Sequence, residues 1–579
     1  MQDFANLLDR LTYEPRRNGK LALMEAFFRA TPDPERGFAL AALTDELEFQ
    51  NAKPGLIRAL IAERADPVLF ALSRDYVGDL SETVALMWPQ KPRPAAGMMG
   101  HNNPPGAPPL SEVVGTLSTI GKSGLQAQLA DWLDNLDEVG RWALLKLITG
   151  ALRVGVSARL AKTAVARLGP VEVNEVEEVW HGLAPPFIPL FDWLDGDGER
   201  PSTLDPAPFR PPMLATPTDY EELTKSYDPA DYAAEWKWDG IRIQIAAGRD
   251  DAGRLITRLY SRTGEDISAA FPDVCEAVDF EGALDGELLI VRGETIQTFN
   301  VLQQRLNRKN VSAKMLRDYP PRVRLYDLLA HNGEDLRTLP FADRRQRLDA
   351  LAPTLGAMFD VSPPVAFTSW DDIAAARLDP ASAGAGDDAA AVEGLMLKRR
   401  DSTYVPGRPK GPWFKWKRDP MIVDAVLMYA QRGSGKRSSF YSDYTFGVWT
   451  GTGPADGELV PVGKAYFGFT DEELKQIDKF VRNNTTARFG PVREVVHEPD
   501  EGLVFEVAFE GLQTSTRHKS GVAMRFPRIS RLRWDKPPAE ADLLSALQGF
   551  LRPETEAAKP ASDQLTLDGI LAPLPATQR

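Results

Sequence analysis

A lysine in the segment EWKWDGIRI has the neighbours that a covalent reaction at phosphorus requires. Lys237 ends a strand-like run, Asp239 follows two residues later, and Gly240 allows the backbone to approach a bound molecule closely. Only an unprotonated lysine can attack phosphorus, yet a free lysine has a pKa near ~10.4. We therefore expect burial and nearby positive charges to lower the pKa of Lys237. The candidate charges are Arg242, Lys415, Lys417 and a bound metal ion. On its own, the pattern also occurs in ordinary turns.

Acidic, aromatic and basic residues follow this lysine in strand-like segments. They are Asp285 and Glu287 in ALDGELLI, Tyr326 in VRLYDLL, Glu393 and Lys398 in EGLMLK, and Lys415 and Lys417 in WFKWK. Residues two apart on a strand point to the same face, so each closely spaced pair is expected to act together. Any one segment is equally typical of an amphipathic strand. Together, acids for a metal and a ribose, a ring for a purine and lysines for phosphate indicate phosphate chemistry.

The composition sets limits on the class of protein. The formal net charge is -14, but residues 398–418 and 517–533 are strongly basic, and binding to a polyanion depends on such local clusters. The only cysteine, Cys275, excludes an internal disulfide and a zinc site built from several thiolates. We expect a cytoplasmic protein with no membrane segment, because no signal peptide and no run of ~18 apolar residues is found.

Changes in residue pattern predict a multidomain protein. Residues 1–205 have the apolar spacing of helices and predict an all-α bundle, interrupted by the Pro- and Gly-rich loop MWPQKPRPAAGMMGHNNPPGAPPL. Residues 206–419 alternate between short strands and helices and predict an α+β domain. Residues 420–550 contain many short strands separated by glycine-rich turns, which predict a β-barrel. Residues 551–579 are polar and proline-rich, and we expect a disordered tail.

Seven segments together resemble a known family. The series KWDG, SRTGED, DGE, LYDLL, EGLMLK, WFKWK and RFPRISRLRWDK, between about residues 210 and 540, resembles the ordered motifs of ATP-dependent DNA ligases, which are covalent nucleotidyltransferases. The helical part, notably LITGALRVGVS, resembles their DNA-binding domain. The resemblance implies an all-α DNA-binding domain, an α+β adenylation domain and an OB-fold domain.

The resemblance also implies a role for each matching residue. Lys237 would attack the α-phosphate of ATP and form lysyl-AMP. The other residues would bind the nucleotide, the nick or a metal: Glu235 (backbone) and Tyr326 the adenine, Glu287 the ribose hydroxyl, Arg242 and Arg262 the ribose and nick phosphate, Lys415 and Lys417 the α-phosphate, Arg525 and Arg528 the pyrophosphate, and Glu393 with Glu287 a divalent metal. Mg²⁺ is the expected ion, since it prefers oxygen ligands and phosphate.

Nicked duplex DNA is the expected partner, bound by a monomer associated with the nucleoid. The tail segment QLTLD, through Gln564, Leu565 and Leu567, resembles a short bacterial peptide that docks onto the sliding clamp, although Asp568 replaces the usual apolar final residue. An RNA ligase or an mRNA-capping guanylyltransferase is the nearest alternative, but neither needs a large helical domain. A non-catalytic DNA-binding protein of the same fold would lack a motif lysine or glutamate. The single cysteine disfavours an NAD-dependent ligase, whose family carries a four-cysteine zinc module.

Overall fold

The computed structural model describes most of the chain. It covers residues 1–77, 79–89, 106–150, 152–202, 205–306, 308, 310–433, 439–515 and 518–551. The centre of the predicted Pro- and Gly-rich loop and the predicted disordered tail from residue 552 lie outside this set. In the described part, no helix is both long and apolar enough to span a membrane.

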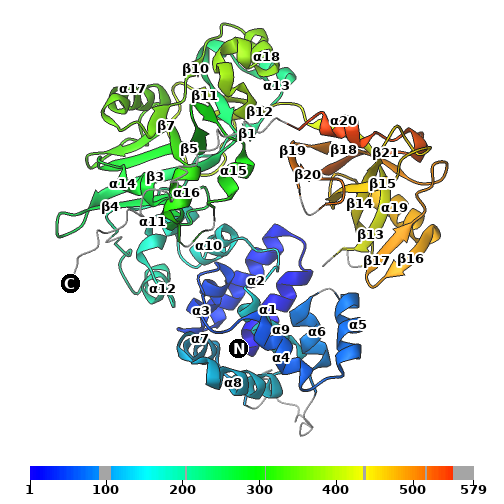
Figure 1. Ribbon diagram of the computed structural model, residues 1–579. Coiled ribbons are helices and arrows are strands. Elements are labelled where there is room, and N and C mark those ends of the chain that lie inside the picture. The colour runs from blue at the N-terminus through cyan, green and yellow to red at the C-terminus, as the bar shows by residue number, and fades with distance from the viewer. Residues whose placement is uncertain are drawn as a thin grey trace, which may run out of the picture.

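The amino-terminal part consists of helices around one apolar core (Figure 1). The helices are α1 (Gln2–Tyr13), α2 (Arg17–Ala30), α3 (Glu35–Leu43), α4 (Pro54–Ala62), α5 (Pro67–Val77), α6 (Leu80–Met87), α7 (Leu110–Thr119), α8 (Lys122–Asn135), α9 (Glu138–Thr149), α10 (Ala158–Ala166), α11 (Val173–Val179) and α12 (Ile188–Asp195). Local sequence sets several ends. The Asp137 side chain caps α9 by accepting from the Gly140 amide, and Gly150 ends that helix with a left-handed φ of 73°.

The middle part contains two sheets with helices around them. The larger sheet has the order β4-β3-β5-β7-β8, with β6 paired to β5 and β9 to β7, and the smaller has the order β1-β12-β11-β2-β10. The strands are β1 (Thr216–Pro217), β2 (Tyr232–Trp238), β3 (Ile241–Arg249), β4 (Leu255–Ser261), β5 (Gly282–Arg292), β6 (Thr295–Ile296), β7 (Pro321–His331), β8 (Glu334–Asp335), β9 (Phe359–Val361), β10 (Pro364–Val365), β11 (Val392–Arg399) and β12 (Trp413–Lys417). The helices are α13 (Tyr220–Ser226), α14 (Pro272–Glu276), α15 (Phe299–Gln303), α16 (Ala313–Asp318), α17 (Phe341–Leu351) and α18 (Trp370–Leu378).

The carboxy-terminal part, the barrel part, is built on one long strand. β13 pairs with β14 along one edge, and with β18 and then β17 along the other, so the sheet must curve around its own core. The strands are β13 (Met421–Arg432), β14 (Tyr441–Trp449), β15 (Leu459–Ala465), β16 (Thr485–Phe489), β17 (Val492–Val495), β18 (Val504–Phe509) and β21 (Arg528–Arg533), with the separate hairpin β19 (Gly511–Thr514) and β20 (Val522–Arg525). The helices are α19 (Asp471–Asn483) and α20 (Leu544–Gln548).

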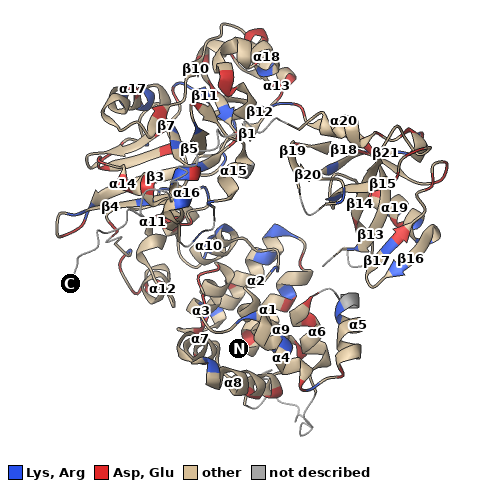
Figure 2. Cartoon of the chain, in the orientation of Figure 1, with Lys and Arg blue, Asp and Glu red and all other residues tan. Residues whose placement is uncertain are grey.

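Charged residues of both signs are spread over all three parts (Figure 2). Many basic residues that the sequence groups together are neutralised locally. Arg533, for example, lies 2.9 Å from Asp424 and 3.0 Å from Asp535. The net negative charge of the chain therefore says little about the charge at any one site, as the sequence predicted.

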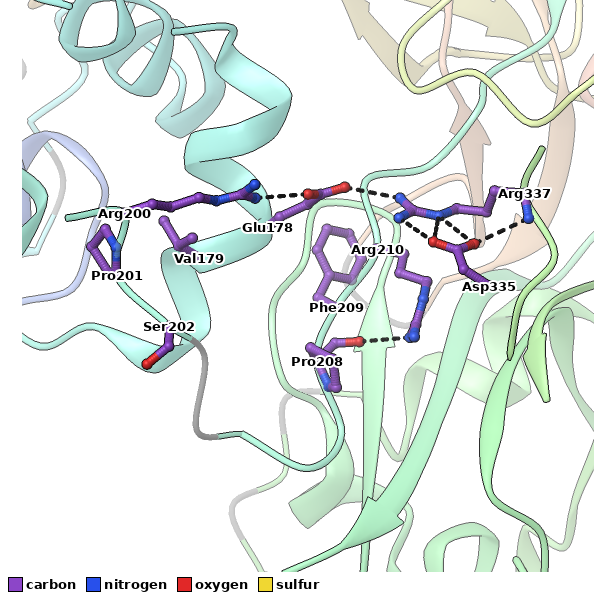
Figure 3. A pocket seen from close by; sticks show the side chains of 10 residues that line it. All are labelled: Glu178, Val179, Arg200, Pro201, Ser202, Pro208, Phe209, Arg210, Asp335 and Arg337. Carbon is purple, nitrogen blue, oxygen red and sulfur yellow. Dashed lines mark hydrogen bonds and ion pairs between the residues drawn. The ribbon is translucent and has the colours of Figure 1, made fainter. Parts of the chain in front are cut away.

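An interface of ion pairs and aromatic rings joins the helical part to the two sheets. Glu178 of α11 accepts from Arg337 at 3.0 Å and from Arg200 at 3.0 Å (Figure 3). His181 packs against the rings of Phe209 and Tyr260, with centroids 5.4 and 4.8 Å away. Burial lowers the pKa of His181 to about 4, so this ring is neutral at physiological pH. The contacts extend from α11 across the linker to β4 and the segment after β8.

A buried ion pair anchors α17 to the larger sheet. The Arg344 guanidinium binds the Asp327 carboxylate of β7 at 2.8 and 2.9 Å, and both side chains are fully buried. Arg344 also donates to the carbonyls of Leu339 and Ser402, so its buried nitrogens have partners.

We predict that Arg344→Ala lowers the free energy of unfolding by about 3–5 kcal/mol, because it leaves the Asp327 carboxylate buried without a counter-charge. Arg347→Ala on the same helix is the matched control, since Arg347 pairs with Glu334 at the surface, where both side chains are about half exposed. Urea unfolding midpoints measure both. Equal midpoints for the two variants would contradict the prediction.

Candidate active site

Lys237 lies near the end of β2 and faces a glutamate on the neighbouring strand. β2 pairs antiparallel with β11, which places Glu393 beside the lysine, and the distance from Nζ to Oε2 is 2.6 Å. The Lys237 side chain is 23% exposed, so its amine is mostly enclosed but open to a ligand on one side. The structure therefore brings Lys237 together with the glutamate that the sequence assigned to the same site.

The expectation of a lowered Lys237 pKa is wrong for the ligand-free structure. Burial lowers the pKa, but the negative charges of Glu393 and Glu287, the hydrogen bond to Glu393 and the charge of Asp239 outweigh burial and raise the pKa above its ordinary value. The sequence suggested cations as the nearest neighbours, whereas the fold places three carboxylates there. Lys237 is an ammonium group in this state.

The three carboxylates influence one another's protonation. Burial and the nearby Glu393 raise the pKa of Asp239, and burial raises the pKa of Glu287 to about 7. Glu393 has a lowered pKa, because the charges of Lys237 and Lys417 outweigh its own burial. Three carboxylates therefore lie close together beside Lys237. In the described residues, no group of three or more His, Cys, Asp or Glu side chains forms a ready metal site.

Gly240 has a packing role that the sequence did not indicate. A Cβ at this position would lie 2.5 Å from the Leu288 carbonyl oxygen and 2.8 Å from Cγ of Glu287. The glycine therefore lets the turn after β2 press against β5, and this contact holds Glu287 close to Lys237.

Two lysines of β12 extend the site on its basic side. Lys417 lies 2.8 Å from Glu510 and 3.7 Å from Glu393. Burial and the neighbouring Lys417, Arg408, Lys237 and Arg262 lower the pKa of Lys415, in that order of effect. Within the described residues, no carboxylate pairs with Lys415, Arg408 or Arg262. Such an unneutralised group of cations is suited to an anion, and Arg408 belongs to it although the sequence did not single it out.

Arg242 lies in an internal network with Asp285, Met213 and Tyr404. Its guanidinium donates to the Asp285 carboxylate at 2.6 Å, to the Met213 carbonyl at 2.6 Å and to the Tyr404 hydroxyl at 3.0 Å. Asp285 is 1% exposed, so the pair is well shielded from water. The proposed contact of Arg242 with a ribose or a nick phosphate would require it to leave Asp285.

Glu235 and Tyr326 meet through Lys398. Glu235 is buried, and its side chain binds Lys398 at 2.8 Å and also Arg345. The Lys398 ammonium lies 4.5 Å from the centre of the Tyr326 ring, and Arg242 lies 5.8 Å from that centre. Two cations thus lie near the tyrosine ring, and each can interact favourably with its π electrons.

The barrel part contributes two arginines and a glutamate. Arg525 binds Asp239 at 2.6 Å and stacks on the ring of Phe299, with its guanidinium carbon 4.2 Å from the ring centre. Arg528 is 3.8 Å from Glu510, the residue that pairs with Lys417. A cavity between the barrel and the sheets is lined by residues of both, including Asp239, Glu393 and Arg525. The sequence predicted both arginines but not Glu510, Phe299 or Arg345, which lie in segments with no distinctive motif.

Comparisons with known proteins match two long segments of the chain to one family. Residues 212–417 match the family described as "ATP dependent DNA ligase domain", and residues 437–536 match "ATP dependent DNA ligase C terminal region". These matches assign a nucleotidyltransferase fold to the two-sheet part and an OB fold to the barrel part.

Individual relatives span much of the chain. A "Probable DNA ligase" of Koribacter versatilis is 36% identical over 441 residues, which cover 71% of each chain. A "DNA ligase" of Methanoculleus marisnigri is 32% identical over 413 residues, which cover 70% of each. The solved structure named "Pmar-Lig_Pre." covers 92% of this chain and 99% of its own, with a TM-score of 0.53 and 14% identity, which shows likeness of fold alone.

We predict that Glu393→Gln makes Lys237 react roughly tenfold faster with an amine-selective acylating reagent near pH 8, because loss of this charge lowers the Lys237 pKa. Mass spectrometry of the labelled peptide measures the rate. Glu472→Gln, which removes the partner of the exposed Lys475, is the control and should leave the Lys237 rate unchanged. A slower or unchanged reaction in Glu393→Gln would contradict the assigned cause.

Proposed function

The chain belongs to the ATP-dependent DNA ligases, and we propose that it seals nicks in duplex DNA through a lysyl-AMP intermediate on Lys237. The observation that carries this proposal is the position of the Lys237 amine, 2.6 Å from Glu393 and beside Lys417 and Lys415. An amine, carboxylates and a group of cations then lie close to one another. That combination suits nucleophilic attack on a phosphate.

In the proposed first step, Lys237 Nζ attacks the α-phosphorus of ATP. A nitrogen–phosphorus bond forms, the bond from the α-phosphorus to the bridging oxygen breaks, and pyrophosphate leaves with that oxygen. The amine gives up its protons to neighbouring carboxylates, of which Glu393 is in direct contact. Lys415 and Lys417 would bind the α-phosphate oxygens, while Arg525 and Arg528 would bind the departing pyrophosphate.

A divalent cation fits the donor set of this site. Glu393 and Glu287 offer only oxygen ligands, which Mg²⁺ prefers, and the charges of both act on Lys237. We propose Mg²⁺ as the ion, held by Glu287 and Glu393. When bound, it would oppose the carboxylate charge that raises the Lys237 pKa.

The adenosine would lie between Glu235, Tyr326 and Glu287. Tyr326 offers an aromatic face for the purine, the Glu235 backbone would read the adenine amino group, and Glu287 would accept from the ribose hydroxyl. Arg242, bound to Asp285 in the free state, would contribute to the ribose end only after rearrangement.

In the later steps, AMP passes from Lys237 to the 5′-phosphate of the nick, and the 3′-hydroxyl then displaces AMP. The exposed Arg262, next to Lys415, would bind the nick phosphate. We propose residues 1–205 as the DNA-binding domain, 206–419 as the adenylation domain and 420–550 as the OB-fold domain. The helical domain would contact the DNA backbone without reading sequence, so its binding should weaken with salt.

We propose a monomer that acts in the cytoplasm, at the nucleoid. The clamp-binding motif of Gln564, Leu565 and Leu567 lies outside the described residues and stays a prediction from sequence.

We predict that Lys237→Ala abolishes labelling of the protein by ATP carrying a labelled α-phosphate, because the Lys237 amine lies 2.6 Å from Glu393, whereas the Lys417 amine is 3.7 Å from Glu393 and pairs with Glu510. Lys225→Ala, at an exposed position on α13, is the matched control and should be labelled like the wild type. Nick sealing is measured in parallel with ATP, GTP and NAD on DNA and RNA strands. Label that persists on Lys237→Ala would exclude this residue as the nucleophile, and labelling by NAD would assign the chain to another cofactor class.

We predict that Arg525→Ala slows self-adenylylation roughly a hundredfold but largely spares the sealing of pre-adenylylated nicked DNA, because pyrophosphate leaves only in the first step. Arg488→Ala, exposed on β16 of the same part, serves as control. An equal loss in both assays would refute the division of roles.

A further inference from the structure

Two adjacent arginines of α17 bind acids in different sheets. Arg344 binds Asp327 on β7 of the larger sheet, and Arg345 binds Glu235 on β2 of the smaller one. α17 therefore ties the strand that carries Tyr326 to the strand that carries Lys237. This helix lies outside every segment that the sequence associated with the chemistry.

Arg345 closes one side of a clamp around Glu235. Arg345 Nη1 donates to Oε1 of Glu235, and Lys398 Nζ lies 2.8 Å from Oε2. A second Arg345 nitrogen, Nη2, donates to the Ser362 carbonyl at 2.7 Å, which fixes the guanidinium plane. The Glu235 side chain is 4% exposed and that of Lys398 is 1% exposed. A buried carboxylate with a cation on each oxygen cannot rotate without leaving a charge unpaired.

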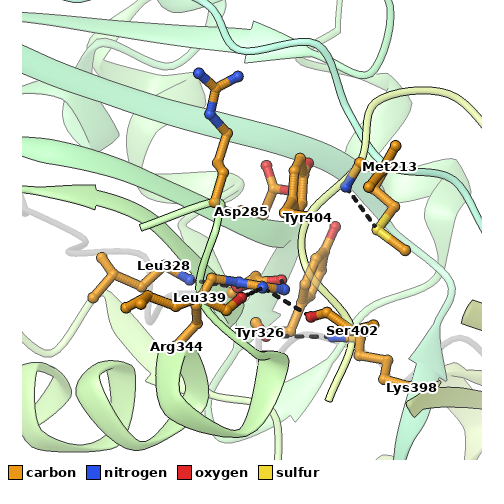
Figure 4. Close-up of polar contacts among 12 residues, drawn as sticks. Met213, Asp285, Tyr326, Leu328, Leu339, Arg344, Lys398, Ser402 and Tyr404 are labelled. Carbon is orange, nitrogen blue, oxygen red and sulfur yellow. Dashed lines mark hydrogen bonds and ion pairs between the residues drawn. The ribbon is translucent and has the colours of Figure 1, made fainter. Parts of the chain in front are cut away.

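Lys398 transmits this clamp to the aromatic ring. Its ammonium donates to the Tyr326 carbonyl at 3.3 Å and lies 4.5 Å from the centre of the same residue's ring (Figure 4). It also lies 4.8 Å from the ring centres of Phe341 and Trp413, so aromatic faces surround it. The position of Lys398 depends on Glu235, and that of Glu235 depends on Arg345.

We propose that Arg345 is a positioning residue for the base of ATP: through Glu235 and Lys398 it holds the Tyr326 ring and the β2 backbone in the geometry that accepts a purine. This inference rests on the proposed function, in which Glu235 and Tyr326 form the adenine pocket. Arg345 itself touches none of the reacting atoms.

Loss of Arg345 should leave the fold intact. α17 keeps its buried anchor through Arg344 and Asp327, and the other acidic partner of Arg345, Asp349, is 54% exposed. Arg345 itself is 15% exposed, so water can reach the space left by a smaller side chain.

The test is the rate of self-adenylylation of the full chain as a function of ATP concentration. In Arg345→Ala we expect KM for ATP to rise roughly tenfold or more, with kcat little changed, because a buried carboxylate loses one of its two partners. The preference for ATP over GTP should fall, and sealing of pre-adenylylated nicked DNA should persist, since that step needs no free nucleotide. Arg345→Lys, which keeps the charge but not the planar fork, should recover part of the lost affinity.

Arg347→Ala is the matched control, because Arg347 lies on the same helix and pairs only with the exposed Glu334. An Arg345→Ala enzyme with wild-type KM for ATP would overturn the inference. So would an equal loss of sealing on pre-adenylylated DNA, since that result would indicate general damage to the domain. A wild-type chain that ATP does not label would overturn the proposed function itself, which distinguishes the two failures.

Discussion

The constraint on which the rest of the site depends is that an amine must become a nucleophile while carboxylates surround it. Glu393, Glu287 and Asp239 raise the Lys237 pKa, so the ligand-free protein holds the lysine charged and unreactive. Lys417, a cation that could offset these acids, lies 3.7 Å from Glu393 and is itself paired with Glu510 at 2.8 Å. The charges at the site must therefore be redistributed before the reaction can begin. An incoming phosphate would pair with the cations, and an incoming metal would pair with the carboxylates.

Much of this arrangement could be predicted from the sequence because the essential residues lie on strands. Alternation along a strand fixes which side chains share a face, so the pairing of Lys415 with Lys417 on one side of β12 follows from their spacing. The sign of the Lys237 pKa shift could not be predicted. It depends on Glu393, which is distant in sequence and is brought close only by the antiparallel pairing of β2 and β11. The packing role of Gly240 could not be predicted for a related reason. Local sequence does not show which neighbouring strand lies against the glycine.

The different roles of the arginines in helix α17 could not be predicted from the sequence pattern. Its segment ADRRQRL contains three arginines with no difference in local context, yet Arg344 is fully buried, Arg345 is clamped to Glu235, and Arg347 pairs at the surface. Only the packing of the helix between two sheets distinguishes them. Glu510, between β18 and β19, is similar, because its importance comes from its contact with Lys417 and not from a motif in its own segment. Residues that support a site through other residues are therefore the ones that motif analysis misses.

The contact of Arg525 with Asp239 has a consequence for the order in which substrates bind. Barrel residues line a cavity together with Asp239 and Glu393, so a duplex that binds at Lys237 would compete with the seated barrel for this site. Competition of this kind is reciprocal. If the closed barrel weakens duplex binding by a certain free energy, a bound duplex destabilises the closed barrel by the same free energy. The enzyme without AMP would therefore bind nicked DNA less tightly than the adenylated enzyme does.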